Sequence, residues 1–445
     1  MAGNVRSSIY RRNVSWQLVG TATGATLSGL LLLVMGRSLG AEGFGTYSII
    51  VGFVTVANLL MEPRMQDVAA RLFWNLESDG VASIEHGLSF LDCLVFETLV
   101  KLLPCLGLII LSSALATIAK LPPDGQLLIL ITAIGNFLAK IGYGLSTGVL
   151  RVLGRSDQFT FCGSGELLIR LVTLTGISVF SELSVTACVI TLSASLLVSN
   201  LVQLGLAARH IGRVNHAQAS WTARGMVARL KEHRRLLMSN IGLSAADLMN
   251  KDLDVSLLSP VVPAATIGVY KMAKNIALLT WRAVDPFYLA LMPELSRRVQ
   301  LRDFNGCQQL LRRSAKGLAL LSFGLTTSAY LGVYFLTGSI LGPDFANVAS
   351  IIVWMLLGVV ISAPLVWGHP LAVALNRGEL PFIGSLLGMA IGLSLFSFLV
   401  ALWGVQGAAI SWTLSFLPHF VFTSTFSYRL LLRQIDADKA AQPRG

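Results

Sequence analysis

The stretch GAEGFGTYSII, residues 40–50, is similar to a second stretch, PAATIGVYKMA, residues 263–273. Both contain a Gly-x-Tyr sequence at the same place, and each joins two long apolar runs. Further along each half, GVLRVLGR corresponds in the same way to AVALNRGE. Duplicated halves of this kind are typical of membrane transporters, whose binding site lies at the interface of the repeats near the middle of the membrane.

The composition argues against a soluble fold. Of the 445 residues, 54% are hydrophobic and 13% are charged, and the mean hydropathy is +0.70. Soluble domains carry roughly 25% charged residues, and a helix needs about 20 mainly apolar residues to cross a bilayer. The sequence therefore predicts an all-α polytopic membrane protein with about twelve transmembrane helices. We place them at 14–36, 44–62, 88–118, 126–150, 159–181, 183–208, 235–259, 264–293, 314–338, 346–370, 381–402 and 404–428.

The distribution of basic residues predicts the orientation of these helices, because cytoplasmic loops carry an excess of Lys and Arg. With the N-terminus in the cytoplasm, most of the 34 Lys and Arg residues fall in cytoplasmic segments, and only Arg37 and Lys120 fall in outer loops. We therefore expect both termini to be cytoplasmic. The net charge of +11 then faces anionic membrane lipids, and no nucleic-acid partner is predicted.

A basic segment divides the chain into two sets of six helices. Residues 1–208 form a predicted N-terminal lobe, 209–234 a cytoplasmic linker, 235–430 a C-terminal lobe and 431–445 a cytoplasmic tail. Two amphipathic stretches, RMQDVAARLFWNL and RRVQLRDFNGCQQLLRR, are expected to lie on the cytoplasmic surface with their apolar faces toward lipid. The five cysteines and six histidines form no ligand pattern, so we predict no metal site, no cofactor and no catalytic residue.

Ionisable residues inside the predicted helices are the candidate functional residues, because each costs about 2.5–3.5 kcal/mol at a helix centre. Three pairs lie four positions apart and therefore share a helical face. Each pair either holds the bundle together through its own neutralisation or contributes a charge to a binding site. The pairs are Glu97/Lys101, Glu166/Arg170 and Asp247/Lys251.

Four further cations, Lys140, Lys271, Lys274 and Arg282, have no acidic residue four positions away on their own helix, although Asp285 lies three positions from Arg282. Cations on several helices predict a positively charged cavity, which would suit a diphosphate because ammonium and guanidinium groups bond strongly to phosphate oxygens. The predicted substrate-binding cations are Lys101, Lys140, Arg170, Lys271, Lys274 and Arg282.

Carboxylates in the same helices could bind H⁺ or Na⁺ and so couple transport to an ion gradient. The carboxylates concerned are Glu97, Glu166, Asp247, Asp252 and Asp254. Asp252 and Asp254 could equally pair with the lysines of the eighth predicted helix, and both alternatives stay open at this point.

The sequence resembles the polysaccharide transporter, or oligosaccharide flippase, family of the superfamily that also contains the multidrug and toxin extruders. Turn motifs carry the resemblance, in the family's order, along nearly the whole chain. GRSLGAEGFGTYSII is similar to the family's N-terminal helix–turn pattern, and LRVLGR to the stretch after its fourth helix. The matching residues outside LRVLGR are Arg37, Gly40, Phe44, Gly45, Tyr47, Asp254, Gly268, Tyr270, Pro293, Gly404, Gly407, Ala408 and Ala409.

The resemblance implies flipping of polyprenyl-diphosphate-linked oligosaccharide repeat units across a bacterial inner membrane by alternating access, before their polymerisation into surface polysaccharide. It implies that the predicted cations hold the diphosphate and sugar acids, and that a polysaccharide polymerase and export machinery are partners. A multidrug or toxin extruder is the main alternative, although a lysine-rich cavity argues against cationic drugs. A membrane polymerase or ligase is a second alternative, disfavoured because the longest predicted outer loop has only about ten residues.

Overall fold

The computed structural model describes residues 2–72, 90–214 and 251–441, together with five single positions between 227 and 248. Every regular element in this part of the chain is helical, so the predicted all-α class is confirmed. The chain divides into two compact units, each described here by itself. Unit 1 consists of Met1–Leu39, Thr46–Leu248 and Ser259–Val261, and unit 2 of Gly40–Gly45, Met249–Leu258 and Val262–Gly445.

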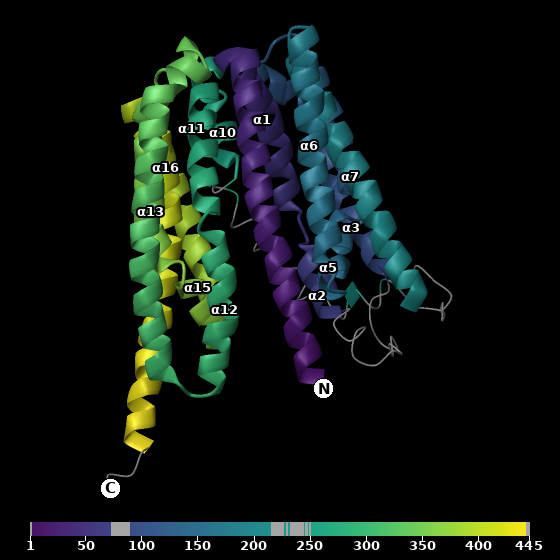
Figure 1. Ribbon diagram of the computed structural model, residues 1–445. Helices are drawn as coiled ribbons and strands as arrows, with labels where there is room; N and C mark the ends of the chain where they lie inside the picture. Colours follow the sequence, from purple (N-terminus) through teal and green to yellow (C-terminus); the bar gives the residue numbers. More distant parts are fainter. Residues whose placement is uncertain are drawn as a thin grey trace. The chain divides into compact units, whose positions relative to one another are not determined.

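Unit 1 is a bundle in which α4 packs against α3 and α7, while α2 packs against α5. Helices α6 and α7 run side by side and are joined by a short connection (Figure 1). The helices of this unit are α1 (Ala2–Leu60, except Gly40–Gly45), α2 (Met65–Leu72), α3 (Phe90–Ile118), α4 (Gly125–Lys140), α5 (Tyr143–Val152), α6 (Ser156–Phe180) and α7 (Val185–Val214).

Unit 2 repeats this pattern of packing. Helix α14 packs against α13 and α16, and α12 packs against α15, as α4 does against α3 and α7 and α2 against α5. The recurrence agrees with the internal repeat inferred from the sequence. The helices of unit 2 are α10 (Leu253–Leu258), α11 (Ala264–Arg282), α12 (Asp285–Gln300), α13 (Phe304–Ile340), η3 (Pro343–Phe345), α14 (Val348–Ser362), η4 (Ala363–Leu365), α15 (Gly368–Ala374) and α16 (Glu379–Ala441).

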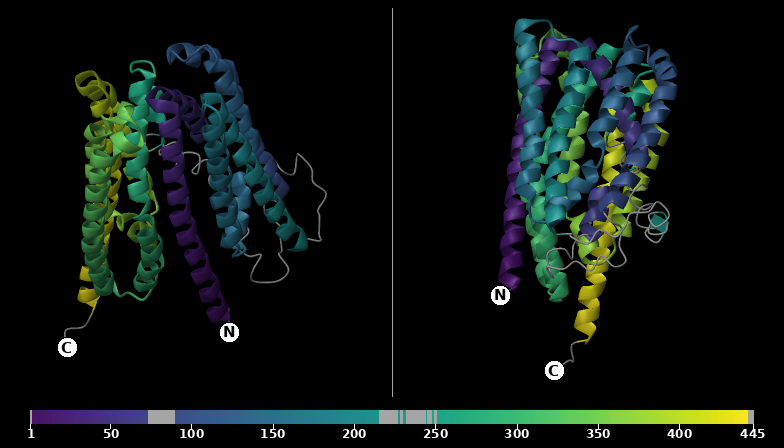
Figure 2. Two further views of the ribbon diagram at one scale, coloured as in Figure 1. Left: turned by 45° about the horizontal axis from the view of Figure 1, so that its top comes forward. Right: turned by 90° about the vertical axis from the view of Figure 1, so that its right-hand side faces the viewer.

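Eight helical segments of the described chain are long and apolar enough to cross a membrane. Two of them, Ser15–Ala69 and Glu379–Asp436, would be about 80 Å long if straight, against a hydrocarbon core of about 30 Å. Each contains a glycine with positive φ, at Gly40 (φ 65°) and Gly404 (φ 55°), a conformation that other residues rarely adopt. The chain turns at these glycines, as Figure 2 shows for α1, so each segment accounts for two predicted crossings.

Three predicted crossings are interrupted helices. Residues 126–150 form α4 and α5, residues 264–293 form α11 and the first half of α12, and residues 346–370 form α14, η4 and the start of α15. Only the end of the predicted helix 235–259 is described, and α10 lies there. An interruption inside a membrane leaves backbone groups without helical partners, which must bond to other parts of the protein.

The prediction that two amphipathic stretches face lipid is wrong for most of their described apolar residues, although Leu301 of the second stretch is exposed. The apolar side of α2, with Met65, Val68 and Ala69, is buried against α5 and its neighbours in the core of unit 1. In the second stretch, Phe304 and Leu311 are likewise buried in a core cluster of unit 2. Amphipathic periodicity specifies that one face avoids water, and here neighbouring helices cover that face.

The glycines of the two similar Gly-x-Tyr motifs, Gly45 and Gly268, meet within unit 2. A Cβ atom at Gly45 would lie 1.7 Å from the backbone oxygen of Ala264, and one at Gly268 would lie 2.0 Å from that of Ala41. No real side chain approaches so closely, so the backbones are in direct contact at both glycines. Small residues allow this close approach of helices in membranes.

Candidate functional site

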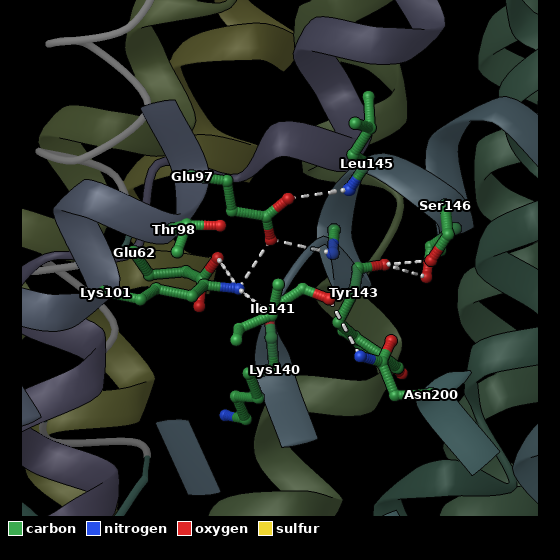
Figure 3. A network of polar contacts seen from close by, with 12 residues as sticks. Glu62, Glu97, Thr98, Lys101, Lys140, Ile141, Tyr143, Leu145, Ser146 and Asn200 are labelled. Atoms are coloured by element: carbon green, nitrogen blue, oxygen red, sulfur yellow. Dashed lines mark hydrogen bonds and ion pairs between the residues drawn. The ribbon is translucent and has the colours of Figure 1, made fainter. Parts of the chain in front are cut away.

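The interruption between α4 and α5 in unit 1 creates a polar site (Figure 3). Helix α4 ends at Lys140, Ile141 is extended, and Gly142 has a left-handed conformation with φ 68°. The left-handed backbone favours glycine at position 142, and a Cβ there would also displace the end of the Leu94 side chain, 2.6 Å away. The interruption leaves the last carbonyls of α4 and the first amides of α5 without intrahelical partners.

Glu97 and Lys101 of α3 bond to both sides of this interruption. The Glu97 carboxylate accepts hydrogen bonds from the backbone amides of Gly144 at 2.9 Å and Leu145 at 3.1 Å. The Lys101 amine donates to Glu97 at 2.6 Å and to the backbone carbonyl of Lys140 at 3.3 Å. Both charges interact favourably with the helix dipoles, because the anion lies at the start of α5 and the cation at the end of α4. The predicted Glu97/Lys101 ion pair is confirmed.

Three residues that the sequence analysis missed complete this network. Glu62, from the connection after α1, lies 3.6 Å from the Lys101 amine and gives the cluster a second carboxylate. Asn200 of α7 donates to the carbonyl of Ile141 at 2.8 Å, and Gln203 donates to two hydroxyl groups of α5 at 2.8 Å. Glu62 lies at the end of a predicted helix and the amides are uncharged, so a search for intrahelical charges passed over them.

A second cluster of unit 1 surrounds Arg170 of α6. Its guanidinium donates to the Tyr47 hydroxyl at 3.0 Å and lies 3.5 Å from Glu166, which accepts a hydrogen bond from Ser195 at 3.3 Å. The ion-pair distance is longer than the 2.7–2.9 Å of a charge-assisted hydrogen bond. Among the described residues, Nε of Arg170 has no hydrogen-bond partner. The predicted pair is present but loose, and Arg170 uses few of its five N–H donors.

The two lysines of α11 are held closely by aspartates. The Lys274 amine lies 2.7 Å from both carboxylate oxygens of Asp254, and both side chains have no exposed surface. The Tyr270 hydroxyl also donates to Asp254, and Lys271 forms an ion pair with Asp252. Of the two alternatives from the sequence, pairing of these aspartates with the lysines of α11 is present in the structure.

The remaining predicted site residues lie at helix ends or outside the described chain. Lys140 is half-buried at the end of α4, and Arg282 is exposed at the end of α11, where its charge interacts with Asp285. Asp247 is outside the described residues. Lys101, Lys140 and Arg170 thus belong to unit 1, and Lys271, Lys274 and Arg282 to unit 2. That they line one cavity stays a prediction.

The corresponding interruption of unit 2, between α14 and α15, has different surroundings. Ala363 and Val366, at this interruption, belong to a buried cluster with Val284, and Trp281 and Tyr288 pack against it. The two equivalent interruptions therefore differ in chemistry, since an ion pair occupies the one in unit 1 and an aromatic, apolar cluster the one in unit 2.

One ionisable cluster lies beyond the predicted crossings, on α12. Glu294 accepts hydrogen bonds from Arg297 at 3.1 Å and Arg298 at 2.8 Å, and these bonds lower the pKa of the Glu294 carboxyl. In the part of the chain that the structure describes, no three His, Cys, Asp or Glu residues gather to hold a metal ion.

Comparison with known proteins identifies the fold. No protein-family model and no curated protein sequence matches the chain. Among solved structures, it is similar to a multidrug resistance MATE family transporter of the MOP superfamily, with TM-score 0.66, 13% identity and coverage of 93% of this chain and 96% of that chain. The lipid II flippase MurJ matches with TM-score 0.65 and 14% identity, over 91% of this chain and 86% of MurJ. The Vibrio cholerae MATE transporter VcmN matches with TM-score 0.57 and 15% identity, over 96% and 98%.

These similarities show the fold: the chain is a multi-pass membrane protein with the twelve-helix, two-lobe fold of these solved structures. The predicted fold class is confirmed. The three solved structures are transporters and a flippase, not enzymes. At 13–15% identity, they establish the fold of this chain and leave its substrate open.

Proposed function

We propose that this protein is a transporter that flips a polyprenyl-diphosphate-linked oligosaccharide across a bacterial inner membrane by alternating access. The observation that carries the proposal is the incomplete pairing of the Arg170 guanidinium. Within the described chain, this guanidinium on a membrane helix donates a hydrogen bond to Tyr47 and forms a loose ion pair with Glu166. A diphosphate would supply the oxygens that its remaining donors require, because planar guanidinium groups bind phosphate in a bidentate manner.

The other intramembrane charges support a division of roles. Lys274 and Lys271 are already neutralised by aspartates, so neither lysine has a free charge to offer a phosphate. Replacing either lysine would leave its aspartate partner without a cation. Of these three cations, Arg170 is held least closely by a carboxylate of the protein, so an external anion would bind it most easily. A flippase named for lipid II shares the fold, and its substrate by name is a lipid, which agrees with this choice.

A multidrug antiporter is the second candidate. The cluster of Glu62, Glu97 and Lys101 has two carboxylates for one amine, and so carries a surplus negative charge when all three are ionised. A surplus anion inside a membrane protein attracts protons or organic cations. Efflux of amphipathic cations without any change in glycan would favour this candidate.

The test is the leaflet distribution of lipid-linked oligosaccharide in a strain that lacks the protein. An impermeant label that reacts with the sugar should find little glycolipid in the outer leaflet of the deletion strain, while total glycolipid accumulates. The wild-type gene and a Glu379→Gln control, which alters an exposed ion pair with Arg377, should restore outer-leaflet labelling, and Arg170→Gln should not. Normal labelling in the deletion strain would reject the flippase proposal.

A further inference from the structure

The tyrosines of the two Gly-x-Tyr motifs have equivalent positions but different partners. Tyr47 follows Gly45 in the first motif, and Tyr270 follows Gly268 in the second. Both side chains are buried, and each hydroxyl bonds to an ionised side chain of its own unit. The repeat thus places a phenol beside a charge twice in the molecule.

In unit 1 the charge beside the phenol is a cation, and in unit 2 it is an anion. Tyr47 accepts a hydrogen bond from Arg170, whereas Tyr270 donates one to Asp254. Asp254 in turn holds Lys274 at 2.7 Å with both partners fully buried. The cation nearest Tyr270 in unit 2 is therefore closely paired, whereas Arg170, the cation beside Tyr47 in unit 1, is only loosely paired with Glu166 at 3.5 Å.

Tyr47 and Glu166 hold the guanidinium through different nitrogens, since Nη2 donates to Tyr47 and Nη1 lies nearest Glu166. Arg170 and Glu166 are four residues apart on one helix and could form a close ion pair, yet they stand 3.5 Å apart while Arg170 bonds to Tyr47 at 3.0 Å. A hydrogen bond from an ionised donor contributes enough to hold a side chain in one of two such arrangements. Without the phenol oxygen, the guanidinium would turn toward Glu166 and lose part of its attraction for an external anion.

We propose that Tyr47 is a positioning residue that keeps Arg170 available for the diphosphate of the substrate, and that Tyr270 has no such role. Diphosphate recognition is then a property of unit 1. This inference rests on the proposed function, because it assumes that the substrate carries a diphosphate. It assigns opposite effects to two neighbours of Arg170: Tyr47 favours anion binding, and Glu166 opposes it.

The test uses the full-length protein in detergent and two probes, farnesyl diphosphate and the uncharged farnesol. Wild type should bind farnesyl diphosphate in preference to farnesol. Tyr47→Phe should weaken diphosphate binding by about tenfold, the loss expected for one charge-assisted hydrogen bond. Farnesol binding should not change. Tyr270→Phe is the matched control, since it removes the same hydroxyl from the equivalent motif, and it should leave the preference intact.

A second variant separates positioning from a general structural role. Adding Glu166→Gln to Tyr47→Phe removes the competing carboxylate and should return diphosphate affinity to within about threefold of wild type. Equal weakening of both probes by Tyr47→Phe, absence of rescue, or loss of diphosphate preference in Tyr270→Phe would overturn the inference. If wild type shows no preference for the diphosphate, the proposed substrate class itself fails, and the inference fails with it.

Discussion

The buried ion pair between Lys274 and Asp254 provides the sharpest test of how unit 2 is held together. Lys274→Met replaces the ammonium by an uncharged chain of similar length and leaves the Asp254 carboxyl without its cation, with no exposed surface. Breaking a buried pair from one side costs about 3–5 kcal/mol. That loss corresponds to more than about a hundredfold in the ratio of folded to unfolded protein.

Removing both charges should cost much less than removing one. In Asp254→Asn/Lys274→Met, neither site carries a charge, and the introduced amide can still accept the hydrogen bond from Tyr270. Replacing a buried ion pair by uncharged groups is often neutral or stabilising. The double variant should therefore recover most of the loss, and the two single changes should be strongly non-additive.

The assay is thermal unfolding of purified full-length protein in detergent, with the remaining monodisperse protein measured by size-exclusion chromatography. Wild type, both single variants and the double variant form one cycle. Lys271→Met is the comparison, because its pair with Asp252 is partly exposed, with 14% and 13% of the side chains accessible, and should cost less. A Lys274→Met protein that unfolds at the wild-type temperature would refute the reasoning.

Three further predictions address other parts of the molecule. Glu97→Gln should destabilise unit 1 by about 1–3 kcal/mol, because the amides of α5 lose a charged acceptor; thermal unfolding measures this, and an unchanged midpoint would contradict it. Gly268→Ala should prevent folding, since its Cβ would lie 2.0 Å from a backbone oxygen, whereas Gly163→Ala, with open space around it, should express normally. The Glu294 pKa is lowered in the folded state, so its small contribution to stability is present at neutral pH and is lost as pH falls through the folded-state pKa. Glu294→Gln should therefore lower stability near neutral pH and leave it unchanged in acid, as unfolding at several pH values would show.

The sequence by itself determined the fold class, because each crossing is set by local properties. Transfer of an apolar segment into lipid depends on about 20 consecutive residues, and the repeat is visible in two eleven-residue stretches. The Glu97/Lys101 and Glu166/Arg170 contacts were also accessible, since partners four apart on one helix must share a face.

Only the tertiary structure decided which charges meet across helices. The sequence left the pairing of Lys274 open because its partner, Asp254, belongs to a different helix, and Glu62 was overlooked because it reaches Lys101 from a connection between helices. The apolar side of α2 gave no indication of whether lipid or protein would cover it. Periodicity along one helix specifies which face is apolar, but what covers that face depends on the packing of segments that are distant in sequence. The same packing decides that Arg170 is loosely paired while Lys274 is neutralised by a close aspartate.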